Sequence, residues 1–246
     1  MNPILLIPAR LASTRLPEKP LADIGGVPMI VRVLRQAEAA GLGPVAVAAG
    51  EAEIVAAVKA AGGQAVLTDP GLPSGSDRIH AALEKLDPEH RHDVVINLQG
   101  DLPALDPAQI RAVAAALTDS GADIATLAAE IVDPSERDNP SVVKAVVAWA
   151  RDGKRGRALY FTRATAPTGD GPLFHHVGIY AYRRDALTRF VGLPPSPLEM
   201  REKLEQLRAL EANMSIAVAR VDSVPLSVDT PSDLAKARQY FARKNP

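Results

Sequence analysis

Residues 28–49 read PMIVRVLRQAEAAGLGPVAVAA, and this stretch contains the pattern on which the fold depends. Its first thirteen residues place apolar side chains at the spacing of an amphipathic helix, and its last six form an aliphatic run typical of a buried strand. Another aliphatic run, ILLI, precedes the pair at residues 4–7. Strand, helix and strand in this order predict a βαβ unit, in which the two strands are parallel.

The same alternation continues further along the chain. A helix, a strand, a helix, a strand and a helix are predicted in turn for AEIVAAVKAA, QAVLT, SDRIHAALEKL, DVVINLQ and PAQIRAVAAAL. Proline follows a capping residue at three predicted helix starts, Asp106, Ser196 and Thr230. We therefore predict a three-layer, Rossmann-like α/β fold with helices on both faces of a mostly parallel central sheet.

From about residue 123 the pattern changes to strands separated by turns, with less helix between them. The strands are predicted for DIATLAAEIV, VVKAVVAWA, RALYFT and HHVGIYAYRR, and the Gly- and Pro-rich residues 165–173 are predicted to be mobile. This part is predicted to form a small antiparallel extension of the sheet or a small lobe. Residues 1–246 are accordingly predicted to form a single domain.

Composition limits the classes of function. A net charge of -1 gives no reason to expect nucleic acid or an anionic membrane as a partner. The absence of cysteine excludes disulfides, thiol nucleophiles and Cys-ligated zinc. The N-terminal residues MNPILLIPAR do not resemble a signal peptide, and no run is long and apolar enough to span a membrane. We therefore expect a cytoplasmic protein without membrane insertion.

The loop after the first strand is unusually basic. It reads IPARLASTRLPEKP at residues 7–20, and it should lie at the carboxyl edge of the sheet, where ligands bind in open parallel sheets. Its guanidinium, hydroxyl and ammonium groups suit a polyphosphate. It matches neither the GxGxxG nor the GxxxxGK[ST] pattern, so dinucleotide binding and P-loop hydrolysis are poorly supported. Charge and position alone leave both a phosphate site and an ordinary solvated loop open.

Two aspartates are predicted at the same edge. Asp101 ends the run DVVINLQGD, and Asp229 lies between a short apolar strand and the helix start Thr230-Pro231. Either one alone would be read as a turn or capping residue. Together, beside a basic loop, they provide the hard oxygen ligands that Mg²⁺ takes along with phosphate and water.

At this point the chain resembles a known family. The segment IPARLASTRLPEKPLADIGGVPMI, at residues 7–30, resembles the signature of bacterial 3-deoxy-manno-octulosonate (Kdo) cytidylyltransferases. The resemblance covers nearly the whole chain and includes SGSDRI at 74–79, NLQGD at 97–101, NPSVVK at 139–144, LYFTRATAP at 159–167, HHVGIYAYR at 175–183, SPLE at 196–199, LEQLR at 204–208 and VDTPSDL at 228–234. It implies a fold like that of the nucleotide-diphospho-sugar transferases and a typical homodimer, with a sugar-binding and dimerisation lobe at about 123–215.

The resemblance also implies a reaction and its residues. The anomeric hydroxyl of the sugar acid would attack the α-phosphate of CTP and release pyrophosphate, with Mg²⁺ held by Asp101 and Asp229, for lipopolysaccharide biosynthesis. Arg15, Lys19, Asp101 and Asp229 would be the catalytic residues. Nucleotide binding falls to Arg10, Ser13, Arg15, Lys19, Ser74, Arg78 and Gln99. The sugar acid would contact Gln99, Arg163, His176, Tyr180, Glu205 and Gln206, of which Arg163 and His176 would donate to its carboxylate.

Some positions depart from the family pattern. Leu102 stands where a glutamate is usual, and the loop 165–173 is short and has no basic residue. A cytidylyltransferase for another acid, such as an 8-amino-type octulosonate or a sialic acid, therefore stays open, as does a non-catalytic nucleotide-binding module. The strand VGIYAYR at 177–183 and a helix LEMREKLEQLRAL at 198–210 offer surface for a dimer, although both could equally pack internally.

Overall fold

The computed structural model describes residues 1–244, so the last two residues of the predicted domain lie outside the described chain. The described chain divides into two compact units, one made of Met1–Ile110 with Pro225 onward and the other of Arg111–Val224. Residues 123–215, predicted as the lobe, fall within the second unit. Among the described residues, no helix has both the length and the apolarity to cross a bilayer.

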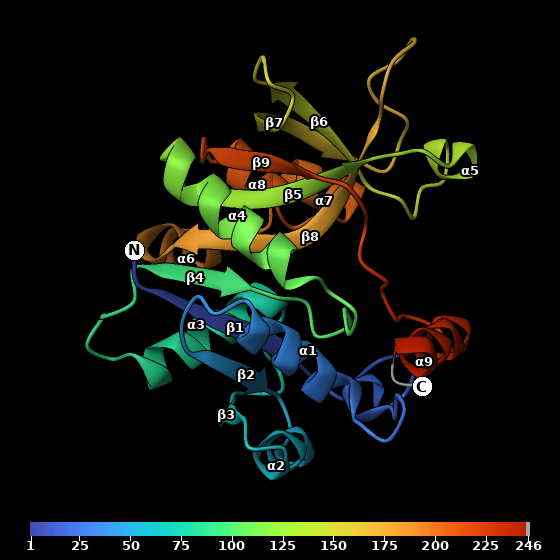
Figure 1. Cartoon of the computed structure of the whole chain (residues 1–246). Helices are drawn as coiled ribbons and strands as arrows, with labels where there is room; N and C mark the ends of the chain where they lie inside the picture. Colours follow the sequence, from blue (N-terminus) through green and yellow to red (C-terminus); the bar gives the residue numbers. More distant parts are fainter. Residues whose placement is uncertain (245–246) are drawn as a thin grey trace. The chain divides into compact units, whose positions relative to one another are not determined.

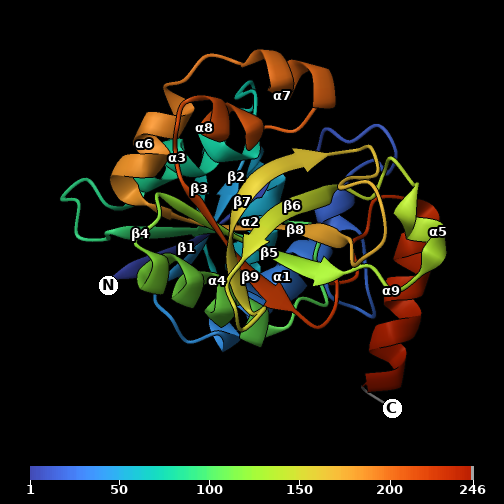
Figure 2. The ribbon, with the colours of Figure 1, turned by 90° about the horizontal axis from the view of Figure 1, so that it is seen from above.

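The first unit contains a parallel sheet in the order β3-β2-β1-β4 (Figure 1). Helices α1 and α3 lie on opposite faces of it in both views (Figures 1 and 2), which makes three layers. This is the arrangement that right-handed βαβ crossovers produce when the strand order reverses, and it confirms the parallel prediction for this unit. Its elements are β1 (Pro3–Ala9), the short 3₁₀ helix η1 (Lys19–Leu21), α1 (Met29–Ala39), β2 (Val45–Ala49), α2 (Ala52–Ala60), β3 (Gln64–Leu67), α3 (Gly75–Leu86), β4 (Val94–Asn97) and α9 (Pro231–Lys244).

The second unit has strands in the order β8-β5-β9-β7-β6. Antiparallel pairing joins all neighbours except β5 and β9, which are parallel. The sheet is therefore mixed rather than purely antiparallel. Its elements are β5 (Ile124–Glu130), α5 (Pro134–Arg137), β6 (Lys144–Trp149), β7 (Arg155–Thr162), β8 (Phe174–Arg183), α6 (Arg184–Val191), α7 (Pro197–Glu202), α8 (Leu207–Glu211) and β9 (Ile216–Val221), while α4 (Pro107–Ser120) begins in the first unit.

The single helix predicted over residues 198–210 is two short helices in the structure. The expected helix over 198–210 ends as α7 at Glu202, and Lys203 takes the left-handed conformation with φ 59° before α8 begins. Glu199 then accepts a hydrogen bond of 2.8 Å from Nε of Arg208. Nine residues of continuous helix would separate these two positions by about 13 Å along the axis. The prediction was wrong because a contact between the two halves requires the chain to fold back.

The short apolar strand predicted before Asp229 does not form either. Residues 222–229 belong to no strand, although Val228 N donates a 3.0 Å hydrogen bond to the carbonyl of Asp101. Val228 is fully buried among side chains instead of being paired in a sheet. An apolar run of this length indicates burial, and the structure shows that here burial comes without a strand.

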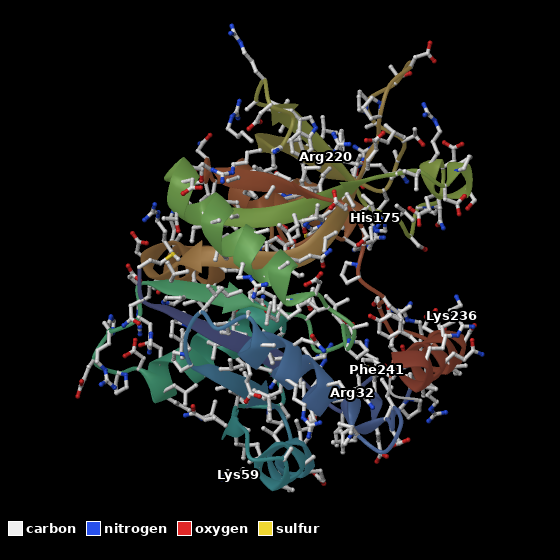
Figure 3. The ribbon with its side chains drawn as sticks, viewed as in Figure 1. Arg32, Lys59, His175, Arg220, Lys236 and Phe241 are labelled. Atoms are coloured by element: carbon white, nitrogen blue, oxygen red, sulfur yellow. The ribbon has the colours of Figure 1, made fainter. Side chains whose placement is uncertain are left out.

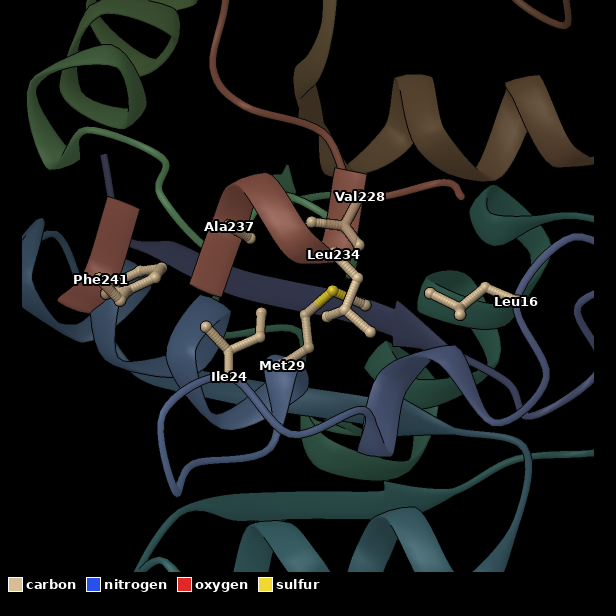
Figure 4. Packing of buried hydrophobic residues seen from close by; sticks show 7 residues of the cluster. All are labelled: Leu16, Ile24, Met29, Val228, Leu234, Ala237 and Phe241. Atoms are coloured by element: carbon tan, nitrogen blue, oxygen red, sulfur yellow. The ribbon is translucent and has the colours of Figure 1, made fainter. Parts of the chain in front are cut away.

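A hydrophobic cluster packs α9 against the other elements of the first unit (Figure 4). The guanidinium of Arg32 adds to this contact, since its Cζ lies 3.9 Å from the centre of the Phe241 ring (Figure 3) and its Nε donates to the carbonyl of Ile24. The cluster joins residues from the basic loop, α1 and the C-terminal segment. Its buried members are Leu16, Ile24, Met29, Val228, Leu234, Ala237 and Phe241.

Candidate active site

The first unit contains a cavity of about 420 Å³ beyond the carboxyl ends of β1 and β4. Ligands bind at this edge in open parallel sheets. Its walls are formed by the basic loop, the start of α3, the residues after β4, and Asp229 shortly before α9. All the residues predicted for nucleotide or metal line it, namely Arg10, Ser13, Arg15, Lys19, Ser74, Arg78, Gln99, Asp101 and Asp229.

A charged cluster occupies one wall of the cavity. The ammonium of Lys19 lies 2.8 Å from Oδ2 of Asp101 and 3.0 Å from Oδ1 of Asp229, and Nη2 of Arg15 lies 3.0 Å from the same Asp229 oxygen. Burial acts to lower the pKa of Lys19, but the two carboxylates outweigh it and raise this pKa above its ordinary value. Lys19 is therefore a fixed positive charge at neutral pH.

The hydrophobic cluster explains why distant residues meet here. Leu16 directly follows Arg15 and Val228 directly precedes Asp229, and both apolar side chains are buried in the cluster shown in Figure 4. The hydrogen bond from Val228 to the carbonyl of Asp101 joins the two acidic segments as well. Apolar packing thus sets the positions from which the charged side chains extend.

The start of α3 forms a second wall. Ser74 is the N-cap of this helix and accepts a 3.1 Å hydrogen bond from the backbone N–H of Asp77. Unpaired N–H groups and the helix dipole at such a terminus favour a phosphate. Gly75 also lines the cavity, and a Cβ there would lie 3.3 Å from Cγ of Pro8. Sequence reasoning missed Gly75, whose only signal was a glycine following the capping serine.

Arg78 is buried, with 2% of its surface exposed. Its Nη1 donates to Oγ1 of Thr68 at 2.8 Å and to the carbonyl of Asp69 at 3.0 Å. Burial is the main cause that lowers the pKa of Arg78. The guanidinium therefore holds residues 68 and 69 in place, and Arg78 is also one of the residues that line the cavity.

Gly100 allows the residues after β4 to approach β1 closely. A Cβ at this position would lie 2.8 Å from the carbonyl oxygen of Pro8, closer than real Cβ atoms come to backbone. Any other residue would push the neighbouring Gln99 and Asp101 away from β1. Sequence reasoning missed this role, although the glycine stands in the middle of the NLQGD motif.

The chemistry of the acidic pair fits a magnesium ion. Mg²⁺ is usually held by one or two carboxylates together with substrate phosphates and water, rather than by a complete protein cage. Within residues 1–244 no group of three or more acidic, histidine or cysteine side chains is placed to hold a metal. Asp101 and Asp229 both contact the ammonium of Lys19, so these two carboxylates would offer ligands that a substrate would have to complete.

The residues predicted to contact only the sugar acid all belong to the second unit. His176 and Tyr180 lie on β8 with ring centres 5.6 Å apart, and Nε2 of His176 lies 3.0 Å from Oγ1 of Thr126. Burial lowers the pKa of His176 to about 3, and burial followed by nearby charges raises that of Tyr180. Both side chains are therefore uncharged at neutral pH, and His176 would donate to a carboxylate only as a neutral imidazole.

Arg163 supplies the positive charge in this group. It follows β7, and its guanidinium donates from Nε to the carbonyl of Glu202 at 2.8 Å and from Nη1 to the carbonyl of Pro140 at 3.0 Å. Glu205 and Gln206 lie in the turn between α7 and α8. The charge of Glu205 is one of the causes that raise the pKa of Tyr180, and Nε2 of Gln206 is buried without a hydrogen-bond partner in the described chain.

Comparisons with known proteins bear on this site. A family model described as Cytidylyltransferase matches residues 4–216. The 3-deoxy-manno-octulosonate cytidylyltransferases of Parvibaculum lavamentivorans and Rhodospirillum centenum are each 65% identical, covering 99% and 96% of this chain and 94% and 92% of their own. A solved structure of a CMP:2-keto-3-deoxy-manno-octonic acid synthetase complexed with CTP is 38% identical, with a TM-score of 0.90, over 99% of this chain and all of that one.

Proposed function

The chain belongs to the 3-deoxy-manno-octulosonate cytidylyltransferase family, and on this premise we propose that it activates Kdo with CTP to give CMP-Kdo and pyrophosphate. This is a nucleotidyl transfer, and in this family it serves lipopolysaccharide biosynthesis. The observation that carries the proposal is the meeting of Arg15, Lys19, Asp101 and Asp229 in one cavity of the first unit.

The reaction needs little covalent chemistry from the protein. The anomeric hydroxyl oxygen of the sugar acid forms a bond to the α-phosphorus, the bond from that phosphorus to the bridging oxygen breaks, pyrophosphate leaves and the hydroxyl proton is released. Such a transfer depends on positioning and on neutralising charge as it develops. Arg10 and Ser13 would hold the triphosphate, and Arg15 and Lys19 would stabilise the leaving pyrophosphate.

Asp101 and Asp229 would hold the magnesium ion. When bound there, Mg²⁺ supplies Lewis-acid polarisation and charge neutralisation at the phosphates. Before substrate arrives, Lys19 keeps the two carboxylates close together by contacting both. Arg15 contacts Asp229 through a largely exposed side chain, so it can turn toward a phosphate at small cost.

The base and sugar would use the remaining residues. Ser74, Arg78 and Gln99 line the nucleotide cavity, and Gln99 would also reach the sugar acid. Arg163, His176, Tyr180, Glu205 and Gln206 would bind the sugar acid. The guanidinium of Arg163 suits its carboxylate, and the unpartnered amide of Gln206 suits a hydroxyl.

Cellular context and assembly extend the proposal. The protein would act in the cytoplasm, without nucleic acid and without membrane insertion, as a homodimer. Large apolar side chains exposed on the second unit, including Leu159 at 48% and Met200 at 54%, support a contact between copies there. Light scattering on the purified chain tests this point, and the mass of a single chain at micromolar concentration would exclude the dimer.

The activity itself is tested by pyrophosphate release. The purified protein would be assayed with CTP, Mg²⁺ and a panel of Kdo, an 8-amino octulosonate and a sialic acid. We expect release that depends on Kdo and is lost in Asp101→Asn, while Asp119→Asn, a surface aspartate paired with Arg155, retains it. Release with another acid only would show that this acid, and not Kdo, is the substrate. No release with any of the acids would favour a non-catalytic nucleotide-binding module.

A further inference from the structure

Glu202, the last residue of α7, contacts Arg163 through both its side chain and its backbone. One carboxylate oxygen accepts a 2.9 Å hydrogen bond from the backbone N–H of Arg163, and the other accepts a 2.7 Å bond from the hydroxyl of Thr162. The main-chain carbonyl of Glu202 accepts from Nε of the Arg163 guanidinium at 2.8 Å. A single residue therefore holds both the backbone and the side chain of Arg163.

These bonds join two segments that are far apart in the sequence. Arg163 follows the end of β7, whereas Glu202 ends α7 and is followed by Lys203 in the left-handed conformation. The chain then turns through Glu205 and Gln206 into α8. Glu202 thus connects the segment that carries Arg163 to the turn that carries two other residues of the proposed sugar-acid site.

These contacts fix the orientation of the Arg163 guanidinium without occupying all of its hydrogen-bond donors. A guanidinium has five N–H donors. Main-chain carbonyls of Glu202, Pro140 and Lys203 accept from Nε, Nη1 and Nη2 of Arg163, the last at 3.5 Å. These contacts set the plane of the group and leave two donors for a ligand, which is what bidentate binding of a carboxylate requires.

We propose that Glu202 is a positioning residue for the sugar acid, which orients Arg163 toward the substrate carboxylate and does not itself touch the substrate. The inference rests on the proposed function. It separates binding of the sugar acid from binding of CTP, because the residues proposed for the triphosphate all belong to the first unit.

The electrostatics agree with this role. Burial acts to raise the pKa of Glu202, but the hydrogen bonds from Arg163 and Thr162 outweigh it and lower the pKa below its ordinary value. The carboxylate is therefore charged at neutral pH. A glutamine in its place keeps the shape and one acceptor oxygen, but it turns a donor toward either the Arg163 N–H or the Thr162 hydroxyl.

The test is a steady-state comparison of Glu202→Gln with Asp123→Asn. Asp123 is a matched control in the same unit, because its carboxylate also accepts from one backbone N–H and one hydroxyl, both of Ser215 at 2.7 Å. For Glu202→Gln we expect the KM for Kdo to rise about tenfold, which corresponds to about 1.4 kcal/mol. The KM for CTP should stay within twofold, and Asp123→Asn should change neither KM.

A milder pair of variants covers the case in which Glu202→Gln does not fold. Thr162→Val removes the hydroxyl bond to Glu202, together with the 3.1 Å bond that this hydroxyl accepts from the backbone N–H of Ala164, and should raise the KM for Kdo two- to threefold, whereas Thr162→Ser keeps both bonds and should retain the wild-type value. Equal changes in Glu202→Gln and Asp123→Asn, or a rise in the KM for CTP as large as that for Kdo, would overturn the positioning role while leaving the activity established. A wild-type protein that releases no pyrophosphate with Kdo would overturn both.

Discussion

Replacing Lys19 with methionine tests the charged cluster at the proposed magnesium site. The change keeps most of the side-chain volume but removes the ammonium that contacts both Asp101 and Asp229. The two carboxylate oxygens lie within about 6 Å of each other, where like charges repel by about 3 kcal/mol at an effective dielectric constant of about 20. The side chains of Lys19 and Asp229 are 17% and 35% exposed, so solvent screens part of this repulsion.

We therefore expect Lys19→Met to lower the free energy of unfolding by about 2 kcal/mol, between the values for exposed and fully buried pairs. In a domain of this size that corresponds to a fall in Tm of about 4 to 8 °C. Millimolar Mg²⁺ should restore several degrees in the variant and fewer in the wild type, because in the wild type the carboxylates already have a cation. Turnover should stay absent even with Mg²⁺, because the ion does not replace the positive charge with which Lys19 would stabilise the leaving pyrophosphate.

The assay is thermal unfolding with and without MgCl₂ at constant ionic strength, together with pyrophosphate release. Lys85→Met is the matched control, because Lys85 lies in the same unit and its ammonium bonds to a backbone carbonyl, that of Leu67. An unchanged Tm in Lys19→Met, or an equal response to Mg²⁺ in both proteins, would refute the reasoning. A double Asp101→Asn, Asp229→Asn variant that keeps the Mg²⁺ response would show that the ion binds elsewhere.

Three further changes have defined outcomes. Because the pKa of His176 is lowered to about 3, the unfolded chain binds a proton that the folded chain does not as pH falls below about 6.5, so this residue costs the wild type up to about 1.4 kcal/mol per pH unit down to about pH 3. Urea unfolding at pH 7 and pH 5 should show a smaller loss in His176→Gln, and identical losses would contradict the burial of a neutral imidazole. Gly100→Ala should destabilise the protein by about 1 to 3 kcal/mol, because its Cβ meets the Pro8 carbonyl at 2.8 Å, and a stability equal to wild type in denaturant would show that the backbone yields freely. Ser74→Ala removes the cap on the Asp77 N–H and should cost about 1 kcal/mol and raise the KM for CTP, whereas a KM that stays constant would limit this serine to capping.

Much of the fold could be predicted because its signals are local. The βαβ pattern in residues 28–49 and its continuation predicted parallel strands, and the first unit has them. The helix start at Ser196 was recognised from a capping residue followed by proline, and α7 begins at Pro197 directly after it. Hydrophobic period and capping depend on neighbours within one or two turns, so they can be read without knowing the tertiary structure.

Predictions failed where a distant contact decided the local conformation. The chain breaks at Lys203 because Glu199 bonds to Arg208 of the next helix, and nothing in LEMREKLEQLRAL marks that position. Val228 is buried by α9 and the basic loop rather than by strand neighbours. LEMREKLEQLRAL was correctly predicted to be largely helical and the segment before Asp229 to be apolar, but the backbone path of neither segment was predicted.

The candidate site divides in the same way. Sequence patterns pointed to Lys19, Asp101 and Asp229, and the structure brings them within 3.0 Å contacts. They did not point to Gly100, whose role is a close approach to Pro8, or to Glu202, which acts on Arg163 39 residues away. A residue that carries the chemistry is recognisable by its type, whereas one that supports it is recognisable only by its partner.

By itself the sequence therefore determined the family, the parallel βαβ core of the first unit and the set of charged side chains that we propose for the phosphates and a metal. Only the tertiary structure decided how these side chains meet. Burial of Leu16 and Val228 in one hydrophobic cluster brings together charged neighbours that lie more than two hundred residues apart. Local sequence specifies chemistry and secondary structure, but the distance between two such charges is set by apolar packing, which depends on the whole unit at once.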